Sequence, residues 1–76
     1  MMNGELSVQA SKQLADDIES LFQGDHERQV QALFQRIFTR NARDEELESC
    51  RLFLTTRSLQ ELSLVLLNTN EFVFAD

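Results

Sequence analysis

RQVQALFQRIF, from Arg28 to Phe38, is the stretch that indicates the fold most clearly. Its apolar residues recur at i, i+3, i+4, i+7 and i+8, the spacing of one helix face: Val30, Leu33, Phe34, Ile37 and Phe38. The polar residues between them are expected to face solvent: Gln29, Gln31, Gln35 and Arg36. The stretch therefore predicts an amphipathic helix that buries one side, with Asp25 in the N-cap position before it.

The same periodicity predicts three more helices around this one. The first runs from about Leu6 to Phe22, with Gly24 placed to end it in a left-handed conformation. The third begins near Asp44. The fourth follows Ser58 and Glu61, which fit the capping-box pattern. The apolar stripes of these helices are Leu14, Ile18, Leu21 and Phe22; Leu47, Cys50 and Leu54; and Leu59, Leu62, Val65 and Leu66.

The connections between these helices are short, which favours antiparallel neighbours. We therefore expect an all-α fold of about four short antiparallel helices, arranged as two helical hairpins, in a single small domain over residues 1–76. Asn68 and Asn70 are expected to end the last helix. Beyond them we expect a short extended C-terminal tail, in which Phe72 and Phe74 point the same way and close the core.

Composition excludes several classes of function. The net charge of −6 argues against nucleic acid and against an anionic membrane surface as partners. A single cysteine rules out an internal disulfide, and no Cys-x-x-Cys pair is present for zinc. No apolar run approaches a membrane span, and no signal peptide is recognisable, so the chain as read is expected in the cytoplasm.

Three motifs resemble those of one family. LLNTNEFVFAD (Leu66–Asp76) and MMNGELS (Met1–Ser7) are similar to the closing and opening motifs of the planctomycete-type domain of unknown function 1553. The stretch from Leu33 to Arg40, followed by Glu45-Glu46-Leu47, is similar to the motif in the middle. Nearly the whole chain is covered, but it resembles only the C-terminal part of a family domain several times longer.

The middle motif departs from the family at Asn41-Ala42-Arg43, where relatives have Pro-Pro-Thr. We therefore expect Asn41 or Asp44 to cap the third helix. The resemblance implies no established activity. Full-length relatives look exported and often carry cytochrome-c-like modules, but the haem-binding motif is missing from this chain, so no haem and no other cofactor is expected on it.

The residues with reactive side chains have structural interpretations beside functional ones. Cys50 lies on an apolar stripe and is expected to be a small core residue, although a nucleophilic pair with His26 is the alternative. His26 is expected to be exposed near the helix cap. Five arginines could form an anion site, but pairing with nearby carboxylates is the favoured interpretation: Arg36, Arg40, Arg43, Arg51 and Arg57.

One group of residues is a candidate functional set. It carries the family-like motifs at both ends of the chain and consists of Asn3, Glu5, Asn68, Asn70 and Glu71. Such a set can bind a sugar or a metal, or it can cap helices and tie down a tail. We assign no catalytic, cofactor or metal residue, and do not expect an enzyme.

The resulting hypothesis is a noncatalytic helical module, or a truncated C-terminal fragment, that acts through packing or protein contacts, including self-association. The alternative is an accessory part of a larger exported hydrolase-like or redox enzyme whose chemistry lies outside this chain.

Overall fold

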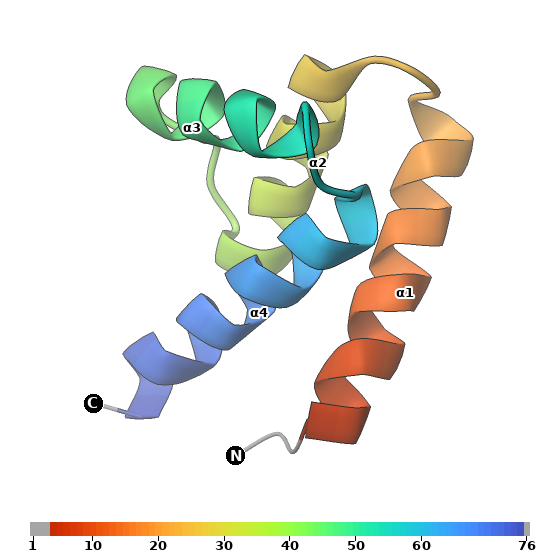
Figure 1. Ribbon diagram of the computed structural model, residues 1–76. Helices are drawn as coiled ribbons and strands as arrows, with labels where there is room; N and C mark the ends of the chain where they lie inside the picture. The colour runs from red at the N-terminus through yellow and green to blue at the C-terminus, as the bar shows by residue number, and fades with distance from the viewer. Residues whose placement is uncertain (1–3, 76) are drawn as a thin grey trace.

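The computed structural model describes the backbone of residues 4–75 and the side chains of residues 8–69. Its helices are α1 (Gly4–Leu21), α2 (His26–Phe38), α3 (Asp44–Leu54) and α4 (Leu59–Ala75). No strand occurs in the part of the chain that is described, so the predicted all-α class with four helices is confirmed. Figure 1 shows α1 and α4 running in opposite directions, with α3 at the end of the molecule away from the two termini.

The most extensive packing joins the first helix to the last. The interface between α1 and α4 is more extensive than that of any other helix pair, and the interface between α2 and α3 is the next most extensive. α1 brings Ser11 and Ala15 to buried positions, and α4 brings Ser63. Side chains this small allow two helix backbones to approach closely, because the distance between helix axes depends on the residues at the contact. The first and last helices of the chain therefore form the most extensive interface of the fold.

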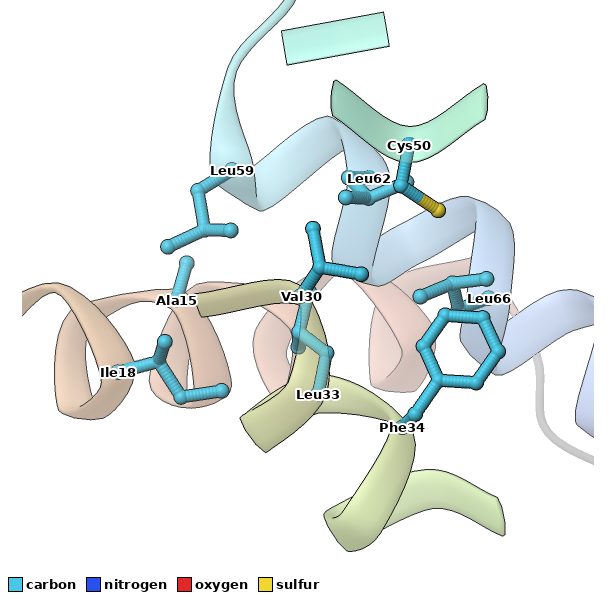
Figure 2. Packing of buried hydrophobic residues seen from close by; sticks show 9 residues of the cluster. All are labelled: Ala15, Ile18, Val30, Leu33, Phe34, Cys50, Leu59, Leu62 and Leu66. Carbon is cyan, nitrogen blue, oxygen red and sulfur yellow. The ribbon is translucent and has the colours of Figure 1, made fainter. Parts of the chain in front are cut away.

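The core is one cluster drawn from all four helices (Figure 2). It consists of Ala15, Ile18, Val30, Leu33, Phe34, Cys50, Leu59, Leu62 and Leu66. Three positions of the α2 stripe are buried, while Ile37 and Phe38 are half-buried. α3 contributes only Cys50 to the fully buried set, so it covers the cluster rather than forming its centre.

The ends of α2 follow standard helix chemistry, with one exception. Asp25 caps the start, since its Oδ1 accepts a hydrogen bond from the Arg28 N–H at 3.1 Å. Gly24 before it has φ +73°, as expected for a left-handed residue. Thr39 ends α2 with φ 57°, and its N–H donates to the Gln35 carbonyl at 3.1 Å. A β-branched residue is costly in this conformation, which glycine or asparagine normally occupies.

The start of α3 differs from the expectation. Neither Asn41 nor Asp44 caps it: the helix begins at Asp44, and the residue before it is Arg43. The Arg43 N–H donates to Glu46 Oε1 at 2.9 Å, so a carboxylate inside the first turn satisfies the backbone instead. The predicted capping box of α4 is confirmed, because Ser58 and Glu61 each accept the other's backbone N–H at 3.0 Å.

Burial departs from the predicted stripes at three positions. Leu21 and Val65 were expected in the core, but they are 63% and 47% exposed. Gln29 was expected in solvent and is only 2% exposed. Its Nε2 donates to the Phe22 carbonyl at 2.8 Å, so the buried amide satisfies a backbone group just beyond the end of α1. α1, α2 and α4 therefore bury a narrower or shifted arc than their sequence patterns alone indicate.

The expected extended tail is wrong. α4 continues to Ala75, so neither Asn68 nor Asn70 ends it. Asparagine costs only about 0.7 kcal/mol or less inside a helix, and the preceding turns supply the nucleus that makes continuation favourable. Helical positions two apart are separated by about 200° around the axis, so the argument for a shared direction of Phe72 and Phe74 does not apply. The side chains of these two residues lie outside the described set.

Among the described residues, Thr39 and Gly24 have positive φ, and substitutions at these two positions should change stability in opposite directions. Thr39→Gly should raise the free energy of unfolding by about 0.5–1 kcal/mol, because glycine adopts the left-handed conformation without the steric penalty. Gly24→Ala should lower it by about 1 kcal/mol, and the cause is the backbone alone, since an added Cβ meets no atom within 4 Å. Urea titration followed by circular dichroism measures both. A loss in the Thr39 variant would contradict the assigned conformation.

Close packing of α1 on α4 generates a second prediction. Ser63→Ala should change the free energy of unfolding by less than about 1 kcal/mol, because the lost hydroxyl bonds only to the Leu59 carbonyl of its own helix, at 2.8 Å. Ser63→Leu should cost about 1–3 kcal/mol by overpacking a fully buried position. The same urea titration tests the pair. Equal tolerance of alanine and leucine would mean that the helices are not closely packed at this point.

Candidate functional site

Of the family-like residues, only Asn68 has a side chain within the described set. Asn3 lies outside the described residues. Glu5, Asn70 and Glu71 lie on helical backbone, but their side chains are outside the described set. Asn68 is exposed on α4. Figure 1 shows the start of α1 and the end of α4 at the same end of the molecule, so the fold brings the two motif-bearing helix ends to one side.

Cys50 and His26 occupy the structural positions expected of them. Cys50 is 7% exposed within the core. Burial raises the pKa of its thiol, and the negative charge of Glu46 raises it further. A raised pKa leaves less thiolate at neutral pH, which is the opposite of what an activated nucleophile needs. His26 is exposed and is the first residue of α2. The core interpretation of Cys50 and the exposed interpretation of His26 are confirmed.

Four of the five arginines pair with carboxylates, as the favoured interpretation predicted. The N–O distances are 3.6 Å for Arg36–Asp17, 2.8 Å for Arg40–Glu46, 3.6 Å for Arg51–Glu48 and 3.3 Å for Arg57–Glu61. All four pairs are partly exposed to solvent, and such pairs contribute little stability individually. The Arg57–Glu61 pair adjoins the α4 capping box, and the Arg40–Glu46 pair is part of a constellation that also includes aromatic rings.

That constellation joins α3 to the loop before it. Arg40 donates two parallel hydrogen bonds to Glu46, from Nη1 to Oε1 at 2.8 Å and from Nη2 to Oε2 at 2.9 Å. This bidentate geometry is the strongest form of an arginine–carboxylate contact. Glu46 Oε1 also accepts the Arg43 N–H, so a single carboxylate holds both the loop and the first turn of the helix.

Arg40 also contacts the aromatic residues of α2. Its guanidinium carbon lies 5.4 Å from the centre of the Phe34 ring and 5.6 Å from the centre of the Phe38 ring. The two rings are 5.2 Å apart and tilted by 49°. The two distances from the guanidinium to the rings are within the range of a cation–π interaction. We call the four side chains together, Phe34, Phe38, Arg40 and Glu46, the Arg40 clasp.

Two glutamines of α2 hold the remainder of the loop. Gln31 Oε1 accepts the Ala42 N–H at 2.8 Å, and Gln35 Nε2 donates to Asn41 Oδ1 at 2.7 Å. Because both terminal nitrogens of Arg40 are committed to Glu46, an incoming anion would have to displace an internal carboxylate. The arrangement therefore fixes the loop against α2 and α3 rather than offering an anion-binding site.

The clasp dominates the electrostatics of this region. The hydrogen bonds from Arg40 and then from the Arg43 backbone lower the pKa of Glu46 from 4.5 to about 2. The pKa of Arg40 is raised in turn, chiefly by its hydrogen bonds to Glu46. A smaller change affects Glu61, whose pKa is lowered mainly by the Ser58 N–H in the α4 capping box. Each shift has a cause in helix capping or ion pairing.

Within the part of the chain that the structure describes, no three His, Cys, Asp or Glu residues gather closely enough to hold a metal ion. Among the same residues, no helix is both long enough and apolar enough to cross a membrane.

In the comparisons with known proteins, no family model, no curated protein and no solved structure matches this chain. The resemblance to the domain of unknown function 1553 therefore stays a prediction, which rests on the motifs of the sequence.

Sequence reasoning identified the members of the clasp but not their assembly. Phe34 and Phe38 belong to the predicted apolar stripe and Arg40 to the arginines expected to pair with carboxylates, while Glu46 is predicted only to lie near the start of the third helix. One feature of the sequence could have indicated that these residues meet. Glu46 is the third residue of α3, the position from which a glutamate reaches back to the preceding backbone. The loop that ends there starts beside Phe38.

The lowered pKa of Glu46 predicts how stability depends on pH. Because the folded-state pKa of about 2 is below the ordinary value of 4.5, this carboxylate stabilises the fold fully above about pH 4.5. That contribution is lost as the pH falls through about 2. Glu46→Gln should therefore weaken the dependence of the unfolding free energy on pH across this window, as measured by urea titration at several pH values. Identical pH dependence in wild type and variant would show that Glu46 is not held by the clasp.

Proposed function

We propose that this chain is a noncatalytic helical module that acts through protein contacts, and that it corresponds to the C-terminal part of a domain like the domain of unknown function 1553. The observation that supports a role in protein contacts is a set of large aliphatic side chains that are exposed to solvent on three helices. They are Val8 at 46% and Leu21 at 63% on α1, Leu52 at 61% on α3, and Val65 at 47% on α4. Apolar side chains in solvent are the surface that a contact with another protein would bury.

The state of the reactive groups supports the noncatalytic part of the proposal. Active sites usually hold groups whose pKa values are shifted toward their chemical task. In this chain the pKa shifts of Glu46 and Glu61 come from helix caps and ion pairs, and that of Cys50 comes mainly from burial. Buried polar side chains are likewise used structurally: Ser11 and Ser63 bond to their own helices, and Gln29 bonds to the chain just after α1.

The charge of the chain supports protein rather than nucleic acid as the partner. At −6, the chain would repel a phosphate backbone at long range. A second copy carries the same charge, so self-association would have to depend on apolar contacts and would strengthen at high salt, as charge repulsion is screened.

Light scattering after size-exclusion chromatography tests the proposal. We expect the measured mass to rise with protein and salt concentration above the 8.8 kDa of one chain. Leu52→Gln combined with Val65→Gln should reduce this rise while the free energy of unfolding changes by less than about 1 kcal/mol, since each position is at the surface. Ser49→Ala is the matched control, because Ser49 is exposed on α3 close to Leu52 and carries no apolar side chain.

The result that would contradict the proposal is equally definite. A chain that keeps the single-chain mass at every protein and salt concentration does not associate through these side chains. Association that is unchanged in the double variant would place the contact elsewhere on the molecule.

A further inference from the structure

The attachment of α3 differs from that of the other helices. It contributes one fully buried side chain, Cys50, while the other eight members of the core come from α1, α2 and α4. Leu47, Phe53 and Leu54 are only partly buried, and Leu52 is 61% exposed. Removing α3 from its position would therefore leave most of the apolar cluster assembled. Elements with few buried apolar contacts are those that open below the free energy of global unfolding.

Polar contacts hold α3 mainly through its first turn. Among the described residues, the hydrogen bonds of the α3 side chains to groups outside the helix are those of Glu46 with Arg40 and with the Arg43 N–H. Arg40 then touches Phe34 and Phe38 of α2. The Arg40 clasp is thus the polar bridge between α3 and α2, and the remaining attachment is apolar packing.

Two short segments, residues 39–43 and 55–58, connect α3 to its neighbours, and we call them the joints. On one side, α2 is already completed by the bond from the Thr39 N–H to Gln35, and Thr39 itself sits at φ 57°. On the other side, the Thr55 and Arg57 N–H groups close α3 on its own carbonyls, and the Ser58–Glu61 box starts α4 independently. Each neighbouring helix keeps its caps when α3 moves.

We propose that α3 opens as a unit about the joints at residues 39–43 and 55–58, that the Arg40 clasp holds it closed, and that opening exposes Cys50 and the core surface beneath it. Figure 2 shows what lies there: Cys50 extends from α3 above Leu62 and Leu66 of α4 and Phe34 of α2. The thiol is inaccessible in the closed state, at 7% exposure. Opening of α3 would make it reactive while α1, α2 and α4 stay folded.

Cys50 is the only cysteine in the chain, so it reports this motion directly. The probe is an aromatic disulfide such as 5,5′-dithiobis(2-nitrobenzoate), added to the native protein. The Cys50 thiolate attacks the reagent disulfide, forms a mixed disulfide with one half and releases the other half as a coloured thiolate. With excess reagent and fast reclosing, the rate of colour release measures the population of the open state.

Four variants separate opening of α3 from the alternatives. Glu46→Gln and Arg40→Gln each break the clasp, and each should raise the labelling rate about threefold, as expected for a partly exposed ion pair. Glu48→Gln removes the same charge from an exposed position of α3 and should leave the rate nearly unchanged. Ile18→Val weakens the α1 side of the core, so it should lower global stability in urea but change labelling less than twofold.

Three results would overturn the inference. If Ile18→Val raises labelling as much as it lowers the equilibrium constant for folding, the thiol is exposed only by global unfolding. If Glu46→Gln raises the rate but Arg40→Gln does not, the effect is the charge beside the thiol and not the clasp. If neither variant changes the rate, the clasp does not hold α3 closed.

Discussion

Burial of apolar surface between α1 and α4 is the interaction on which the remainder of this small structure depends. These helices are the first and the last of the chain, and their packing is the most extensive in the molecule. Small buried residues on both helices, Ser11 and Ala15 of α1 and Ser63 of α4, allow close packing. A chain of this length buries only about 60% of its unfolded surface, so one well-packed interface has a large share of the stability.

The position of this interface has consequences for the other two helices. α2 supplies Val30, Leu33 and Phe34 to the cluster that the α1–α4 pair begins, and α3 closes it from outside with Cys50. Side-chain hydrogen bonds and the bidentate Arg40–Glu46 ion pair are concentrated at the turn between α2 and α3. There the Arg40 clasp and the glutamines of α2 position a loop whose first residue, Thr39, adopts an unfavourable backbone conformation. Function through protein contacts would use the surfaces that this arrangement leaves in solvent.

Local sequence determined much of what could be predicted. The number of helices, the Asp25 cap and the Ser58–Glu61 box depend on neighbours within four residues, and the structure confirms them. Burial at the edges of each stripe depends on which helix packs where. Leu21 and Val65 satisfy the helical period but lie beyond the reach of the neighbouring helices, whereas Gln29 is buried with its amide bonded to the Phe22 carbonyl. The end of α4 differs from the prediction because Asn68 and Asn70 do not terminate a helix that cooperativity extends.

The Arg40 clasp could not be predicted as a unit, since its parts come from a helix, a loop and the following helix, and only the fold places them together. Hydrogen exchange of the native protein tests the central role of the α1–α4 interface most directly. We predict that backbone amides near Ile18 of α1 and Leu62 of α4 exchange slowest and at a common free energy, equal to that of global unfolding. Lasting protection in α2 and α3, with fast exchange in α1 and α4, would contradict it.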